Sequence, residues 1–169
     1  MRKYLKCCNN ISNLSSVFAR RPTALAIVRG EANHSTINGV VRFYKINTGV
    51  IVASEINGLP YSDDKCKENI FAMHIHSGEE CTGNINDPFA NAMTHYNPEN
   101  CEHPQHAGDM PPLFGNGGYA FSVFFTDRFS VEEIIGRTVI IHDRADDFHT
   151  QPAGNSGSKI ACGQIKRII

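Results

Sequence analysis

Histidine is concentrated in the middle of the chain, where acidic side chains and cysteine accompany it. The segment CEHPQHAGD, at positions 101–109, contains two histidines, an aspartate and a cysteine. Upstream the chain reads FAMHIHSGEEC at 71–81, and downstream it reads TVIIHDRADDFH at 138–149. Seven of the eight histidines lie in these segments or in THYNP between them. Because imidazole and carboxylate groups are ligands for transition metals, this clustering indicates metal chemistry.

The loop motif is the stronger of two candidate metal-binding patterns. It supplies a ligand set of the kind that fills a closed tetrahedral zinc site, namely His95, His103, His106 and Asp109. Several prolines and Gly108 leave this loop with little to hold it in place, and a bound metal would supply the missing cross-link. The alternative is a charged, solvated loop without a metal.

The second pattern is HIH. A strand's period of two places His74 and His76 on the same face, where both can reach one ion. His142 follows GRTVII, a buried-strand pattern, and at the end of that strand it can complete a site with the pair. Taken singly, an HxH pair also fits the solvent face of an edge strand, and a lone histidine after a buried strand is more often a core residue.

Composition limits the class of protein. The 169 residues suit one domain, long enough to bury a core without a disulfide or a metal for stability. With 16 basic and 17 acidic side chains, the net charge does not indicate electrostatic binding to nucleic acid or to an anionic membrane. No apolar run approaches the roughly 18 residues of a membrane span. The segment PAGNSGSK lacks the glycine spacing and the Ser or Thr of a phosphate loop.

The first residues bear on the compartment. MRKYLKCCNNISNLSSVF has basic residues but no apolar core of a secretory signal, which predicts a cytoplasmic protein. No acidic residue precedes Glu31, a feature shared with organellar transit peptides, so an organellar or exported location stays open. We expect residues 1–22 to form a weakly ordered tail.

Short apolar or alternating runs recur between turn residues, which predicts an all-β protein. The candidate strands are ALAIVRGEA, GVVRFYKI, GVIVASEI, NIFAMHIH, GYAFSVFFT, TVIIHD and KIACGQIKRI. Only DRFSVEEIIGR can hold even a short helix. This number of strands implies a sandwich or barrel, and the long irregular stretches at 76–118 and 143–158 are expected to carry the function.

Several motifs occur in one order along the chain: HIH, HYNP, HAGD, GRTVIIHDRADD and GNSGSKIACGQI. In this order and setting they resemble the copper–zinc superoxide dismutases, over residues 23–169, which would form one domain. The resemblance implies a Greek-key β-sandwich, or flattened eight-stranded barrel, with long metal-binding and electrostatic loops. The long segment between His76 and His95 resembles bacterial members more than animal ones.

The resemblance also implies a role for each residue of the metal sites. Copper would be bound by His74, His76, His95 and His142, and zinc by His95, His103, His106 and Asp109. His95 would bridge the two metals as an imidazolate, because a cation can replace each of its N–H protons. Asp146 would link His74 to His103 from outside the two ligand sets.

The activity implied by the resemblance is superoxide dismutation. Superoxide is then the small-molecule substrate, copper cycles between two oxidation states, and the products are dioxygen and hydrogen peroxide. His95 would give a proton to the forming peroxide, while zinc, which has no redox chemistry, would hold the loop. Cys81 and Cys162 match the family's disulfide between the metal loop and the last strand. A homodimer is the candidate assembly, although the sequence leaves the oligomeric state open.

The chain departs from the family at several positions. Lys159 replaces the active-site arginine, keeping the charge but losing the planar fork that holds an anion at two points, so we expect weaker anion guidance. Ala153 stands where animal members carry a threonine, and the loop from 142 to 159 is shorter than theirs, which predicts a more open mouth. Cys66 and Cys101 form a second disulfide or remain free buried thiols, two alternatives that the sequence does not separate.

Two classes of function remain: an enzyme that dismutes superoxide, and a non-catalytic β-sandwich that binds zinc or copper for structure, delivery or partner contacts. The complete set of copper ligands favours the enzyme.

Overall fold

A computed structural model describes residues 14–64, 66–67 and 69–169. Most of the regular structure is β-strand, and the predicted all-β class is confirmed. The strands are β1 (Ala24–Gly30), β2 (Asn38–Ile46), β3 (Gly49–Asn57), β4 (Ile70–Phe71), β5 (Met73–His76), β6 (Leu113–Phe114), β7 (Ala120–Thr126), β8 (Thr138–His142) and β9 (Lys159–Arg167). The helical segments are α1 (Leu14–Phe18), η2 (Ala32–His34), η3 (Ala90–Ala92) and α2 (Val131–Ile134).

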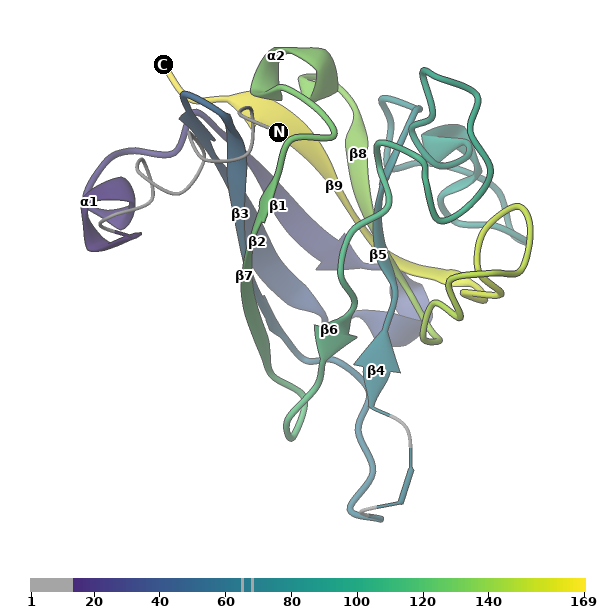
Figure 1. Cartoon of the computed structure of the whole chain (residues 1–169). Coiled ribbons are helices and arrows are strands. Elements are labelled where there is room, and N and C mark those ends of the chain that lie inside the picture. Colours follow the sequence, from purple (N-terminus) through teal and green to yellow (C-terminus); the bar gives the residue numbers. More distant parts are fainter. Residues whose placement is uncertain (1–13, 65, 68) are drawn as a thin grey trace.

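In the described part of the chain, seven strands form one antiparallel sheet in the order β5-β8-β9-β1-β2-β3-β7. The remaining strands, β4 and β6, pair with each other, and β6 contacts β7. Figure 1 shows the sheet curled into a half-barrel, with β4 and β6 in front of it. The chain crosses from β3 at one side of the sheet to β5 at the opposite edge, which gives the strand order of a Greek key.

Alternating side chains explain why these segments are strands. In β1, Ala24, Ala26 and Val28 are fully buried, whereas Ile27 between them is 54% exposed. This is the period-two pattern of a sheet that packs one face on the core. Strands β2 and β3 form a hairpin in register from Asn38 opposite Asn57 to Ile46 opposite Gly49. The core lies inside the half-barrel, on the concave side of the sheet.

Three elements differ from the sequence prediction. NIFAMHIH contains two strands, and the residue between them, Ala72, continues the pairing with the end of β8 out of regular register. Its N–H donates to the carbonyl of Arg144 at 2.7 Å, and its carbonyl accepts from the N–H of His142 at 2.9 Å. Strand β6 has two residues, too few to leave an alternating pattern. Helix α1 lies within the expected tail and packs on the sheet, where the rings of Phe18 and Tyr44 meet edge-on, 5.4 Å apart. Residues 1–13 of that tail lie outside the described residues.

The two long irregular stretches, after β5 and after β8, lie on the same side of the molecule (Figure 1). A disulfide between Cys81 and Cys162 joins the first of them to β9, as the resemblance implied. A second disulfide between Cys66 and Cys101 is wrong, because both are free; the expected burial of free thiols is also wrong, because both are exposed. They lie on different loops, one before β4 and one after β5. No helix among the described residues is long and apolar enough to cross a bilayer.

Candidate metal centre

The HIH pair lies in an enclosed strand. Strand β5 carries His74 and His76 and pairs on one side with β8, which ends at His142. On its other side the long loop bridges it, through Asp109 opposite His74 and His95 opposite His76. His74 is therefore 0% exposed and His76 2%. The interpretation of HIH as the solvent face of an edge strand is wrong.

Four imidazoles converge in the first set. Their candidate ligand atoms lie within 4.8 Å of one another, in His74, His76, His95 and His142. Nε2 of His76 faces Nε2 of His142 at 3.3 Å. The opposite ring atoms donate to backbone carbonyls, Nδ1 of His76 to Met93 at 2.9 Å and Nδ1 of His142 to Gly157 at 3.3 Å. These two bonds select the tautomer whose Nε2 lone pair is directed at the shared space.

Asp109 lies at the centre of the second set. The ligand atoms of this set also lie within 4.8 Å of one another, in His95, His103, His106 and Asp109. One carboxylate oxygen of Asp109 is 2.8 Å from Nδ1 of His95, and the other is 3.0 Å from Nδ1 of His103 and 3.3 Å from Nδ1 of His106. The Asp109 side chain is only 5% exposed. The alternative of a solvated loop is therefore wrong.

His95 belongs to both sets. Its Nδ1 faces Asp109, and its Nε2 is buried without a hydrogen-bond partner. Nδ1 of His74 and Nδ1 of His103 are buried and unpaired as well, the latter because its contact with Asp109 lacks hydrogen-bond geometry. A buried polar nitrogen without a partner is unfavourable, and a bound cation would satisfy it. The donor atoms therefore fit two metal ions that share His95.

Asp146 joins the two sets from outside. Its two oxygens accept from Nε2 of His74 and from Nε2 of His103, both at 2.8 Å, and the N–H of Phe148 donates at 2.7 Å. Burial raises the pKa of Asp146, but these hydrogen bonds lower it further, to about 2, so the carboxylate is charged at neutral pH. With Nε2 protonated in both rings, each Nδ1 presents its lone pair to a metal.

Burial keeps imidazoles of the first set neutral. It lowers the pKa of His76 well below the usual value and that of His142 to about 3, and neighbouring imidazoles contribute to both shifts. Burial also lowers the pKa of His74, although the hydrogen bond to Asp146 opposes the shift. Because a metal binds the neutral form of imidazole, protons do not compete for these nitrogens near neutral pH.

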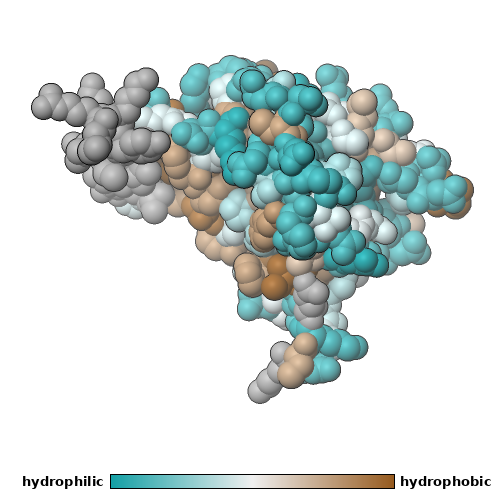
Figure 2. Space-filling view, turned by 45° about the vertical axis from the view of Figure 1, so that its right-hand side comes forward, coloured by the Kyte–Doolittle hydropathy of each residue, from teal (hydrophilic) through white to brown (hydrophobic). Residues whose placement is uncertain are grey.

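A cavity of about 580 Å³ opens onto the first set. His76, His95 and His142 reach it, and Lys159 and Ala153 form part of its wall. The side of the molecule that carries the long loops, brought forward in Figure 2, is covered mostly by hydrophilic residues. A molecule small enough to enter the cavity can therefore reach the imidazoles of the first set.

Three residues of the site were given no role in the sequence analysis. Asp87 contacts Lys159 in the cavity wall. Gln151 binds both backbone groups of His103, accepting from its N–H at 3.0 Å and donating to its carbonyl at 2.7 Å. At Gly154, a Cβ atom would lie 2.0 Å from Oδ1 of Asp146. None of the three belongs to a metal-ligand motif.

The fold and the site together define a class of protein: a curled antiparallel β-sheet with two adjoining sets of candidate metal ligands that share one histidine. Residues 37–165 match the family described as copper/zinc superoxide dismutase. The chain is 32% identical over 143 residues to superoxide dismutase (Cu-Zn) 2 of Aquifex aeolicus, covering 76% of this chain and 78% of that protein. It is 30% identical over 151 residues to superoxide dismutase (Cu-Zn) A of Xenopus laevis, covering 79% and 92%. It is also 29% identical over 158 residues to the copper chaperone for superoxide dismutase of Homo sapiens, covering 85% and 53%. The chain belongs to the copper/zinc superoxide dismutase family.

Proposed function

We propose that this protein catalyses the dismutation of superoxide, with copper in the first set and zinc in the second. His74, His76, His95 and His142 would hold copper. His95, His103, His106 and Asp109 would hold zinc. The observation that carries this proposal is His95, which belongs to both ligand sets, with Nδ1 facing Asp109 and Nε2 buried without a partner.

Bound copper supplies the redox step, in which one superoxide loses an electron to become dioxygen and a second gains it, with two protons, to become hydrogen peroxide. The chain supplies one of those protons. Nε2 of His95, which is buried without a hydrogen-bond partner, would take a proton and donate it to the forming peroxide as a general acid. Asp146 holds His74 and His103 in the tautomer that directs Nδ1 inward. Lys159 contributes a positive charge to the cavity wall.

Metal analysis combined with a superoxide assay tests this proposal. We expect the purified protein to bind one copper and one zinc per chain, and to dismute superoxide much faster than the same amount of aqueous copper. Protein loaded with zinc alone is the control and should be inactive, because zinc does not change its oxidation state. Binding of zinc but not copper, or activity no greater than that of free copper, would contradict the proposal.

The similarity to a protein named as a copper chaperone favours one second candidate, copper delivery. A chain that binds copper at the first set without dismuting superoxide, and that transfers the ion to a metal-free acceptor, would support delivery instead. The same preparation serves both measurements.

The remaining expectations from the sequence are proposals of the same kind. We propose a homodimer, and the support is an aromatic surface on β6 and β7, where Phe114 is 62% exposed, Phe121 61% and Phe125 37%. Sedimentation of the wild type and of Phe121→Asp tests it.

The boundary between a tail at 1–22 and a domain at 23–169 stays a prediction, which proteolysis tests. The cytoplasmic location also stays a prediction, which cell fractionation tests.

A further inference from the structure

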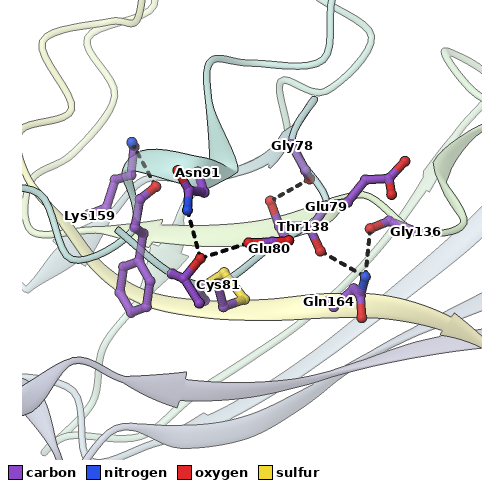
Figure 3. The surroundings of a disulfide bond; sticks show 12 residues. Gly78, Glu79, Glu80, Cys81, Asn91, Gly136, Thr138, Lys159 and Gln164 are labelled. Atoms are coloured by element: carbon purple, nitrogen blue, oxygen red, sulfur yellow. Dashed lines mark hydrogen bonds between the residues drawn. A yellow bond between two sulfur atoms is a disulfide. The ribbon is translucent and has the colours of Figure 1, made fainter. Parts of the chain in front are cut away.

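Lys159 does not enter the cavity wall as a free cation. Its Nζ lies 2.7 Å from Oδ2 of Asp87 and donates to the carbonyl of Phe89 at 3.1 Å. Figure 3 shows Lys159 reaching toward the loop that contains Asn91, beside the disulfide bond. The side chain of Lys159 is 15% exposed and that of Asp87 39%. An anion that enters the cavity therefore meets a lysine already paired with a more exposed carboxylate.

Asp87 is held in this position by its own loop. Its Oδ1 accepts from the N–H of Phe89 at 3.0 Å, and its N–H donates to Oδ1 of Asn84 at 3.1 Å. Phe89 in turn is buried against Ile140 and Cys162. The disulfide ties the same loop to β9, the strand that carries Lys159. The ion pair is therefore fixed from both sides by the fold.

The pair changes the field that an anion meets. Among the described residues that line the cavity, Lys159 is the one lysine or arginine and Asp87 is the one carboxylate. Two opposite charges 2.7 Å apart act at longer range as a dipole, whose field weakens faster with distance than that of a single charge. Capture of a charged substrate depends on the long-range field, so the carboxylate opposes the pull of the ammonium group.

We propose that Asp87 restrains the attraction of superoxide by Lys159 and so limits the rate at which this enzyme captures its substrate. The inference rests on the proposed function, because it concerns the approach of an anion to the first set. If the expected weaker anion guidance is measured, this inference attributes it to Asp87 in addition to the exchange of arginine for lysine.

The test compares single and double substitutions of Asp87 and Lys159 in proteins that contain equal amounts of copper and zinc. Asp87→Asn should raise the second-order rate constant at low ionic strength by about threefold or more, and the gain should shrink as salt screens Lys159. Asparagine keeps an oxygen for the N–H of Phe89. Lys159→Ala should slow the reaction at low salt, because the unpaired carboxylate of Asp87 then repels the anion. Added salt should raise the rate of this variant relative to wild type, because it screens that repulsion. The double variant should depend on salt less than either single variant, because neither charge remains in the cavity wall.

Glu132→Gln is the matched control. Glu132 forms an ion pair of 2.8 Å with Lys45 outside the cavity, and its substitution changes the net charge by the same amount. It should leave the rate and its salt dependence as in wild type. If Asp87→Asn behaves like this control, the inference is wrong.

Azide binding provides a readout that does not depend on turnover. Azide is a small monoanion, like superoxide, and its affinity for the copper-loaded protein can be measured from the visible absorption spectrum. Asp87→Asn should bind azide several-fold more tightly than wild type at low salt and about equally at high salt. Equal affinity at both salt concentrations would contradict the inference even if the wild type were inactive. An inactive wild type would contradict the proposed function alone.

Discussion

At the scale of single residues, Asp109 is the carboxylate that contacts the most imidazoles in the site. Its two oxygens face three imidazoles of the second set, and its Oδ2 also accepts from the N–H of His106 at 3.0 Å. Burial raises the pKa of Asp109, but the hydrogen bond with His95 and the neighbouring imidazoles lower it further. Asp109 is therefore the one carboxylate that this set offers to a cation.

Asp109→Ala should weaken zinc binding by on the order of a hundredfold or more, since loss of an outer partner alone often costs tenfold to a hundredfold. Three neutral ligands remain, and copper should still bind with an altered visible spectrum. Competition with a chelating zinc dye measures the affinity, and hydrogen exchange measures the expected loosening of residues 77–112. An Asp109→Ala protein with wild-type zinc affinity would refute the placement of zinc in the second set.

Gly154 is needed because of what surrounds it. A Cβ there would lie 2.0 Å from Oδ1 of Asp146 and 2.7 Å from Nε2 of His103, and the backbone has a φ of +65°. Gly117, with a φ of +57° and nothing within 4 Å of the position of a Cβ, separates the steric effect from the backbone strain.

Gly154→Ala should therefore cost about 1–3 kcal/mol more in unfolding free energy than Gly117→Ala, the usual cost of overpacking. It should also lower zinc affinity by roughly tenfold, because it displaces Asp146 from His103. Urea unfolding of the metal-free proteins and zinc competition measure the two effects. Equal losses of stability in the two variants would show that only the backbone conformation matters.

At the scale of elements, the two long loops are joined through one amide side chain. Gln151, in the loop after β8, pairs with both backbone groups of His103, in the loop after β5. This arrangement resembles one rung of a β-ladder, although neither loop is a strand. It positions the backbone of a proposed zinc ligand that Asp146 holds by its ring.

Gln151→Ala should lower zinc affinity by about tenfold and raise hydrogen exchange at His103, because the loop loses two anchors. Gln151→Glu keeps an acceptor for the N–H of His103 but places a carboxylate against its carbonyl, so it should not restore binding. Gln164→Ala is the control, since that amide donates to the carbonyls of Glu79 and Gly136 instead. The positioning role fails if the substitutions of Gln151 and Gln164 change zinc affinity equally.

The difference between local patterns and contacts that join distant segments explains what the sequence could predict. The period of two in HIH and the strand end at His142 indicated three residues of the first set, and the loop motif indicated the second set, because each is a local pattern. The place of His95 in the first set followed only from the family resemblance. The contacts of Asp87 and Gln151 are different, because each joins segments far apart in the chain through one side chain. Such contacts leave no periodicity in either segment, so only the structure reveals them.

At the scale of the whole molecule, β9 holds the long loop after β5 by two kinds of link. Lys159 near its start forms the ion pair with Asp87, and Cys162 forms the disulfide with Cys81. The disulfide closes a segment with a sequence separation of 81. Every residue proposed to bind a metal lies within that segment except His74 and His76, which lie on β5.

Removing the disulfide should therefore destabilise the entire site. On the chain-entropy estimate, closing a segment of this length stabilises the fold by about 4 kcal/mol. Cys81→Ala combined with Cys162→Ala should lower the unfolding free energy of the metal-free protein by that order, measured in urea without reductant. Cys66→Ala combined with Cys101→Ala is the matched control: both thiols are free and exposed, so stability should change by less than about 0.5 kcal/mol per site. A loss of stability no larger than the control's would mean that the packing of Phe89 against Ile140, rather than the covalent bond, fixes the loop on β9.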